Sequence, residues 1–235
     1  MRAAIYFTPP AGAPLTRAAA EWLGRGAFDG EPTRPRDKRL DPLVEQPARY
    51  GFHATMKAPF HLADDTDLAD LDARLAAFCA SRDAVAIDAL VIDRLGSFFA
   101  FVPETPPVAL VELAAAVVRT FEPMRAPMSE EDIRRRNPDK LSERQREQLA
   151  EWGYPYVFND FRFHMTLTGS VDAKDQAKVG KRLAKHFGAL DGAPIAIDRL
   201  AIFVEPEPGA PFRLHSMHPF DPRRDRTEVA GALVA

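Results

Sequence analysis

The chain has 235 residues, of which 46% are hydrophobic, and this is enough apolar material for one large domain or two ordinary lobes. Its formal net charge of −3 excludes a general nucleic-acid coat, which would need an excess of Lys and Arg over the whole surface. Basic residues instead cluster locally, at 34–39 and 134–146.

The cysteine content and the hydropathy indicate the cellular compartment of the protein. Cys79 is the single cysteine, so the chain forms no internal disulfide and no cysteine metal cluster. The sequence has no apolar run of membrane-spanning length, and it begins without the charged segment and long apolar core of an export signal. We therefore expect a cytoplasmic protein without a membrane partner.

The first half of the chain alternates strand and helix patterns. In chain order we expect a strand at 3–8, a helix at 14–25, a loop at 29–47, a strand that contains His53, a helix at 66–82 and a strand at 84–93. The loop is predicted because Pro, Arg and Asp dominate there without any hydrophobic period.

The second half repeats this alternation around a charged insertion. We expect a strand at 97–103, a helix at 108–121, a helical insertion at about 124–150, a strand that contains His164, a helix at 172–187 and strands at 194–204 and 211–217. Ser129 and Ser142 precede acidic residues in the insertion, which is typical of helix N-caps.

The two halves of the chain are similar to each other. The tripeptide Ala-Ile-Asp begins at Ala86, 33 residues after His53, and again at Ala196, 32 residues after His164. We predict an α+β fold of two pseudo-symmetric lobes, at about 1–93 and 97–218, with facing, mainly antiparallel sheets, helices outside and a central cleft. These lobes would form one bilobal domain over 1–220, followed by a flexible tail at 221–235.

The strongest motif is Phe-His-x-Thr, which occurs at His53 with Thr55 and again at His164 with Thr166. In a strand, His and Thr two positions apart share a face. A lone His-x-Thr is usually structural, but its recurrence in a repeated context favours a site of two imidazoles and two hydroxyls. Such a site suits phosphodiester hydrolysis or transesterification, in which one His removes a proton, the other donates one, and the hydroxyls bind phosphoryl oxygens.

Three cationic residues near the motifs are candidate phosphate contacts. Lys57 shares strand parity with His53, and Arg49 and Arg162 share parity with their histidines. The alternatives are a solvated lysine and surface ion pairs. The run Arg134–Arg136 is either a cover that clamps phosphate or the wet face of a helix, and the sequence does not distinguish these.

No cofactor or metal site is expected. The chain has no His-Glu-x-x-His motif, no glycine-rich phosphate loop and no Gly-x-Ser-x-Gly motif. His215 and His218 are three residues apart, so in a strand they point in different directions and are unsuited to bind one metal. His186 is predicted to cap the C-terminus of a helix. The proposed acid–base chemistry requires no metal.

The paired motifs resemble those of the 2H (two-histidine) phosphoesterase superfamily, which includes 2′,5′-RNA ligase-like proteins. The stretches Arg49–Phe60 and Trp152–Gly169 look like an uncharacterised branch encoded in bacterial phosphonate-metabolism operons. The resemblance implies that His53 and His164 are the acid–base pair and that Thr55 and Thr166 bind phosphate. Which histidine is the base stays open.

The residues and the resemblance together predict a metal-independent phosphodiesterase that acts on a small cyclic phosphodiester. By analogy with phosphonate catabolism, a sugar cyclic phosphate such as a phosphoribosyl cyclic phosphate is one such substrate, and a nucleoside cyclic phosphate is another. The alternatives are processing of RNA 2′,5′ linkages or 2′,3′-cyclic phosphate ends, a non-catalytic binder of nucleotides or phosphorylated ligands, and a duplicated structural domain. We expect a monomer that binds a small phosphorylated molecule and no long nucleic acid.

Overall fold

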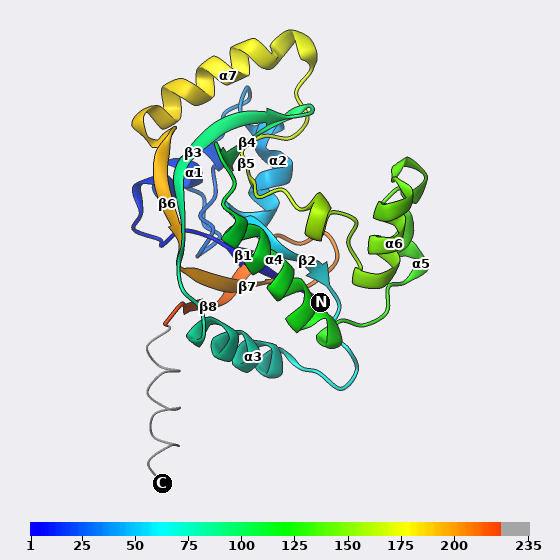
Figure 1. Cartoon of the computed structure of the whole chain (residues 1–235). Helices are drawn as coiled ribbons and strands as arrows, with labels where there is room; N and C mark the ends of the chain where they lie inside the picture. The colour runs from blue at the N-terminus through cyan, green and yellow to red at the C-terminus, as the bar shows by residue number, and fades with distance from the viewer. Residues whose placement is uncertain (222–235) are drawn as a thin grey trace, which may run out of the picture.

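Eight strands form one antiparallel sheet in the order β6-β3-β4-β5-β2-β1-β7-β8 in the computed structural model, which describes residues 1–221 (Figure 1). The strands are β1 (Arg2–Phe7), β2 (Ala54–Phe60), β3 (Val85–Leu95), β4 (Phe98–Pro103), β5 (Met165–Thr166), β6 (Ala193–Ile197), β7 (Arg199–Glu205) and β8 (Arg213–Pro219). The helices are α1 (Pro14–Leu23), α2 (Asp41–Tyr50), α3 (Leu68–Ala80), α4 (Val108–Phe121), α5 (Glu130–Arg135), α6 (Glu143–Trp152) and α7 (Ala173–Phe187). No helix within residues 1–221 is long and apolar enough to cross a membrane.

The sheet consists of two halves that meet at the strands bearing the His-x-Thr motifs. One half is β2-β1-β7-β8 and the other is β5-β4-β3-β6, and β2 pairs with β5 at the centre. The predicted α+β class with antiparallel strands is confirmed, although one continuous sheet replaces two facing sheets. The halves also differ from the predicted lobes, because β3 belongs to the second half while β7 and β8 return to the first.

The sheet curls strongly, as the connection between β6 and β7 requires. The strand predicted at 194–204 is in fact two strands separated by Asp198 alone. β6 pairs with β3 at one edge of the sheet, whereas β7 pairs with β1 in the other half. A single residue can connect such distant positions only if the sheet curves so that they approach each other, and Figure 1 shows this curvature.

One face of the sheet is covered by helices and the other is largely open. On β1, Ala3, Ile5 and Phe7 belong to the main core, which includes buried residues of α1, α2, α3, α4 and α7. The intervening Ala4 and Tyr6 belong to a small second cluster on the opposite face. We call this second face the open face. Alternation along β1 therefore decides which side chains are available for a site.

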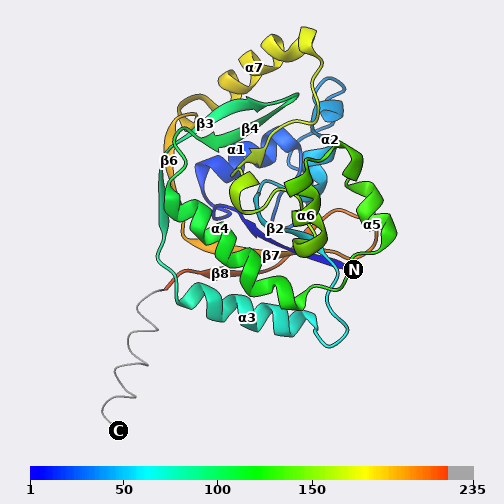
Figure 2. The same ribbon diagram turned by 45° about the vertical axis from the view of Figure 1, so that its right-hand side comes forward.

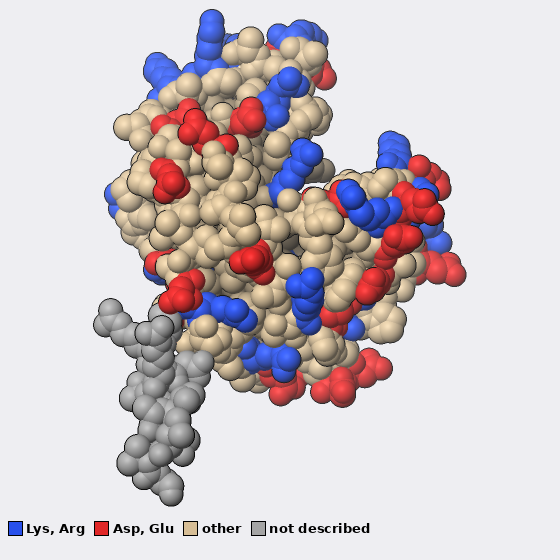
Figure 3. All heavy atoms as spheres, viewed as in Figure 1, with Lys and Arg blue, Asp and Glu red and all other residues tan. Residues whose placement is uncertain are grey.

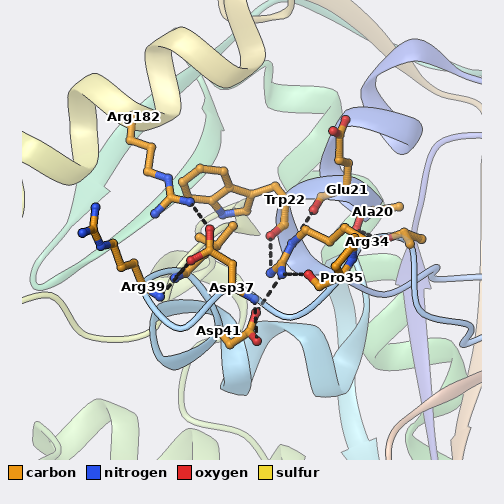
Figure 4. Close-up of polar contacts among 11 residues, drawn as sticks. Ala20, Glu21, Trp22, Arg34, Pro35, Asp37, Arg39, Asp41 and Arg182 are labelled. Atoms are coloured by element: carbon orange, nitrogen blue, oxygen red, sulfur yellow. Dashed lines mark hydrogen bonds and ion pairs between the residues drawn. The ribbon is translucent and has the colours of Figure 1, made fainter.

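The segment predicted as a loop at 29–47 contains the beginning of α2. Pro42 and Pro47 obscured the helical pattern, yet Pro is tolerated in the first turn and Val44 and Pro47 are buried against the core. The remaining loop is held by ion pairs from Arg34 to Asp41, at 2.8 Å, and from Arg182 of α7 to Asp37, at 2.7 Å (Figure 4).

The predicted helical insertion forms α5 and α6, which stand apart from the other helices in Figure 1 and come in front of β2 in the turned view of Figure 2. We call residues 125–161 the arm. Ser129 and Ser142 each accept a hydrogen bond from the backbone three residues on, so both predicted caps are confirmed. The tail predicted for 221–235 lies, apart from Asp221, outside the described residues.

The buried Trp22 of α1 fixes the strand segment after the second motif, because its indole N–H donates to the Leu167 carbonyl at 2.8 Å. We expect Trp22→Phe to lower the free energy of unfolding by about 1–3 kcal/mol, since it leaves that buried carbonyl unpaired. Urea unfolding followed by circular dichroism measures this loss. Val108→Ala is the control, because Val108 is 73% exposed, and equal stability of the two variants would contradict the assignment.

Candidate active site

The two His-x-Thr motifs lie side by side on the open face of the sheet. Ala54 of β2 pairs with Met165 of β5, and both are fully buried on the helix-covered face. Their neighbours in sequence therefore point to the open face, which brings both histidines and both threonines together.

The antiparallel register sets the spacing of the two imidazoles. Continuing the ladder from the Ala54–Met165 pair places His53 opposite Thr166 and Thr55 opposite His164. The two histidines are then diagonal neighbours, for which backbone separations of about 7–8 Å are usual. Side chains that lean inward from such positions leave room for one phosphate group between the two rings.

Backbone carbonyls hold both imidazole rings in matching orientations. His53 Nδ1 donates to the Gly51 carbonyl at 2.9 Å, and His164 Nδ1 donates to the Arg162 carbonyl at 2.7 Å. Each ring thereby keeps its Nε2 atom for chemistry on the open face. The Thr55 hydroxyl lies 3.3 Å from His53 Nε2, so the first motif is already internally hydrogen bonded.

Burial keeps both imidazoles neutral at neutral pH. The pKa of His53 is lowered to about 4 by burial and, less strongly, by the charge of His164, while the Gly51 carbonyl has the opposing effect. Burial also lowers the pKa of His164, although the Arg162 carbonyl opposes this. The pKa of His53 thus responds to the charge of His164, in agreement with the register that makes the two residues diagonal neighbours.

An arginine-rich cleft of about 680 Å³ opens over the motifs. His53, Thr55 and Thr166 line it, and His164 lies on the same strand face two residues from Thr166. Its charged lining, among the described residues, consists of Asp132 and the arginines Arg2, Arg49, Arg125, Arg135 and Arg136. An excess of guanidinium groups beside two neutral imidazoles favours an anionic ligand.

Arg49 and Arg162 occupy different positions relative to the cleft. Arg49 belongs to the last turn of α2 and not to a strand, and its guanidinium lines the cleft while it pairs with the buried Glu205. Arg162 is exposed and its side chain is not part of the cleft lining, but its carbonyl orients His164. Arg49 therefore stays a candidate ligand contact, whereas Arg162 contributes through its backbone.

Lys57 lies on the opposite face of the sheet from the motifs. Thr55 pairs with Tyr6 and Lys57 pairs with Ile5, so a β-bulge between them reverses the alternation. The strand parity predicted for Lys57 is therefore wrong. Its Nζ atom forms a 2.8 Å ion pair with Glu122 on the helix-covered side, and the side chain is only 4% exposed.

Glu122 connects the buried Lys57 to the cleft. The carboxylate also pairs with Arg125 at 2.6 Å, and Arg125 lines the cleft at the start of the arm. A Cβ on Gly153 would lie 2.9 Å from the Arg125 side chain, which shows how closely the arm packs on this guanidinium. Lys57 thus contacts Glu122, which holds Arg125 at the cleft, and does not itself line the cleft.

Sequence reasoning missed several aromatic residues of the cleft. Tyr6 stacks on His53 with ring centroids 3.8 Å apart and an interplanar angle of 24°. Tyr50 and Tyr154 also line the cleft. The alternation of β1 indicates that Tyr6 faces away from the side on which Ile5 is buried. Only the pairing of β1 with β2 shows that the face of Tyr6 is also the face of His53.

The histidines outside the motifs have local partners or line the cleft rim. His218 pairs with Asp72 at 2.7 Å, His186 contacts the Ala18 carbonyl at 2.8 Å, and His61 lines the cleft. Within residues 1–221, no group of three or more His, Cys, Asp or Glu side chains is arranged to hold a metal ion.

Comparison with known proteins identifies a family match and more distant similarities. Residues 55–213 match the family described as "Protein of unknown function (DUF1045)". The chain is 37% identical over 238 residues to "Ribose 1,5-bisphosphate phosphokinase PhnN" of Janthinobacterium sp. (strain Marseille). The match covers 97% of this chain and 52% of that protein, so the chain spans about half the length of this curated relative.

Two solved structures are similar over most of the chain. TT0787 of Thermus thermophilus has a TM-score of 0.47 and 13% identity, and the match covers 95% of this chain and 100% of that one. E. coli LigT complexed with NADP+ has a TM-score of 0.41 and 11% identity, with coverage of 94% and 97%.

The burial of His53 predicts a low pKa for its imidazole. In a ¹H–¹⁵N NMR titration of the histidine side chains, we expect His53 to have a pKa of about 4, because burial disfavours its cationic form. The signal is assigned as the one that His53→Asn removes. His164→Asn removes the neighbouring charge but not the burial, so the pKa of His53 rises and yet stays below 6.5. A midpoint for His53 of 6.5 or higher in the wild type would contradict this description.

The position of Lys57 predicts a structural rather than a ligand-binding effect. We expect Lys57→Met to lower the free energy of unfolding by about 2–3 kcal/mol, less than is typical for a broken buried pair because Arg125 still neutralises Glu122. Affinity for inorganic phosphate, measured by calorimetry, stays unchanged. Unaltered stability combined with weaker phosphate binding would instead place Lys57 in the ligand site.

Proposed function

The chain belongs to the DUF1045 family, whose description assigns no function, and we propose one from the geometry of the cleft. We propose that the protein is a phosphodiesterase that acts on a small cyclic phosphodiester. His53 and His164 would carry out acid–base catalysis. The observation that carries this proposal is the pairing of β2 with β5, which presents both His-x-Thr motifs on one face. His53, Thr55 and Thr166 line the arginine-rich cleft, and His164, two residues from Thr166, supplies the second imidazole that the reaction requires.

We assign the base role in hydrolysis of the ring to His53, because it is the imidazole whose low pKa leaves it almost wholly unprotonated. Its pKa of about 4 keeps Nε2 unprotonated at neutral pH, so it can accept a proton from water as the water oxygen attacks phosphorus. The bond from phosphorus to one ring oxygen breaks, and His164 donates its Nε2 proton to that leaving oxygen. The product is a phosphomonoester with a free hydroxyl.

The substrate itself prepares His164 for the acid role. Burial lowers the pKa of His164 in the free protein, but a bound phosphodiester anion favours the cationic imidazole and raises it. Thr55 and Thr166 donate hydrogen bonds to the non-bridging oxygens, where negative charge builds up in the transition state. In ring formation, the reverse reaction, the two histidines exchange these roles.

The size of the cleft and the curated relative point to a sugar cyclic phosphate. A cleft of about 680 Å³ fits a small molecule. The name of the relative specifies ribose 1,5-bisphosphate as the molecule its kinase activity concerns. Opening a 1,2-cyclic phosphate on a ribose 5-phosphate, by cleavage of the bond to O2, leaves a phosphate on C1 and so forms ribose 1,5-bisphosphate. We propose a phosphoribosyl cyclic phosphate as the substrate, in keeping with a role in phosphonate catabolism.

A second substrate class, the nucleoside cyclic phosphates and RNA ends bearing them, is favoured by the tyrosines of the cleft. Tyr50 and Tyr154 line the cavity and offer aromatic faces on which a base could stack. The charge distribution limits the length of such a substrate. Lys and Arg are interspersed with Asp and Glu on the face shown in Figure 3, which forms no continuous basic track for a long strand.

Removal of either histidine should abolish turnover while binding persists. We expect His53→Asn and His164→Asn each to lower kcat/KM by about 10²–10⁴-fold, because each removes one proton-transfer group. Thr166→Val should cost about 10²-fold, by analogy with loss of one oxyanion donor. Ribose and nucleoside cyclic phosphates are assayed by phosphorus NMR with EDTA present.

Two controls make this assay decisive. Calorimetry with the same ligands on the Asn variants shows whether binding survives the loss of turnover. Failure of the wild-type protein to open any of the cyclic phosphodiesters, with or without added divalent cations, would refute the enzymatic proposal. Retained binding in that case would favour a phosphorylated-ligand binder.

A further inference from the structure

We propose that the cleft contains a second anion subsite, formed by Arg136 and the hydroxyl of Tyr6, that binds a phosphomonoester group carried elsewhere on the substrate. This inference rests on the proposed function for the scissile phosphate, and it deepens that function by naming what selects the substrate. The subsite would make the enzyme specific for cyclic phosphodiesters that bear a separate terminal phosphate.

Arg136 is the arginine of the cleft that lacks a carboxylate partner. Arg2 and Arg49 share Glu205, Arg125 pairs with Glu122, and Arg135 pairs with Glu131. Among the described residues, no Asp or Glu oxygen lies within 4.0 Å of the Arg136 guanidinium. A cation that lines a cleft without a counter-ion is prepared for an anionic ligand.

The arm places Arg136 differently from its two neighbours. Arg134 and Arg135 form ion pairs with Glu130 and Glu131 one turn earlier on α5, and both side chains are at least half exposed. Arg136 follows the helix and is half-buried, with its guanidinium 5.0 Å from the centre of the Tyr154 ring. The aromatic face holds the guanidinium over the cleft while leaving its N–H groups available in the ring plane.

Tyr6 supplies an unused donor in the same cleft as this guanidinium. The residue is 1% exposed and lines the cleft, and its hydroxyl makes no hydrogen bond within the described residues. Burial raises its pKa well above the ordinary value, while the charges of Arg2 and Arg136 act in the opposite direction. The hydroxyl is therefore protonated, can donate to a phosphate oxygen, and lies within the electrostatic reach of Arg136.

Tyr6 also fixes the subsite next to the reacting groups. It pairs with Thr55 across β1 and β2, and its ring stacks on His53 at 3.8 Å. A ligand phosphate that accepts from the Tyr6 hydroxyl thus lies close to the imidazole that activates water in the proposed reaction. A small sugar can bridge two phosphate groups at such a separation, whereas a molecule with one phosphate leaves Arg136 unpaired.

The test compares two substrates that differ only in the second phosphate, ribose 1,2-cyclic phosphate with and without a 5-phosphate. We expect Arg136→Gln to lower kcat/KM for the phosphorylated substrate by about 10- to 100-fold, the range for loss of charge-assisted hydrogen bonds. The unphosphorylated substrate should be almost unaffected, so the preference of the wild type disappears. Tyr6→Phe keeps the ring and should give a smaller loss in the same direction.

Arg134→Gln is the matched control, because Arg134 belongs to the same helix, is 70% exposed and does not line the cleft. It should leave both substrates unchanged. Equal losses on the two substrates in Arg136→Gln, or no preference of the wild type for the 5-phosphate, would overturn the subsite.

Binding of ribose 5-phosphate separates this proposal from the proposed reaction. Calorimetry on the His53→Asn, His164→Asn double variant requires no turnover, and we expect binding that Arg136→Gln weakens by about 10- to 100-fold. If no cyclic phosphodiester is opened but this binding depends on Arg136, the reaction fails and the subsite stands. If ribose 5-phosphate does not bind, or binds equally well without Arg136, the subsite fails whatever the reaction.

Discussion

The candidate site depends on the backbone pairing of Ala54 with Met165, the point where β2 meets β5 and the two halves of the sheet join. β5 has only two residues, so this pairing needs outside support. The Thr168 hydroxyl accepts from the Phe99 amide, and the Trp22 indole donates to the Leu167 carbonyl. These buried contacts fix a strand that is too short to hold its own register, and they thereby fix the separation of the two imidazoles.

The burial of the imidazoles and the excess of guanidinium groups have opposite effects on the attraction of an anion to the cleft. Burial keeps His53 and His164 neutral in the free protein, so the histidines add no charge to attract a ligand. The arginines supply that charge, but Glu205 and Glu122 hold several of them in place. In the reaction we propose, the arginines therefore bind the anion and the imidazoles transfer protons, and a bound anion would favour the cationic form of an imidazole.

The sequence predicted which face carries the two His-x-Thr motifs better than it predicted their surroundings, for reasons that individual residues show. His and Thr two apart share a face in any regular strand, so the motifs were readable without coordinates. Lys57 was misplaced because a bulge depends on the neighbouring strand, which local sequence does not reveal. The roles of Tyr6 and Arg136 also required tertiary structure, since β1 precedes the motif by more than forty residues and Arg136 lies in an insertion.

The near symmetry of the sheet does not extend to the surroundings of the two histidines. Each histidine immediately precedes a central strand, and its Nδ1 donates to a carbonyl two residues earlier. However, Tyr6 stacks on His53 at 3.8 Å, whereas the aromatic ring beside His164 is that of Phe98, tilted and 5.8 Å away. The Tyr6 ring is part of the enclosure of His53, and burial is the largest cause of the lowered pKa of that imidazole. The two halves of the sheet thus supply two equivalent positions, and in the reaction we propose, the different aromatic residue beside each one distinguishes the imidazole that accepts the proton from the one that donates it.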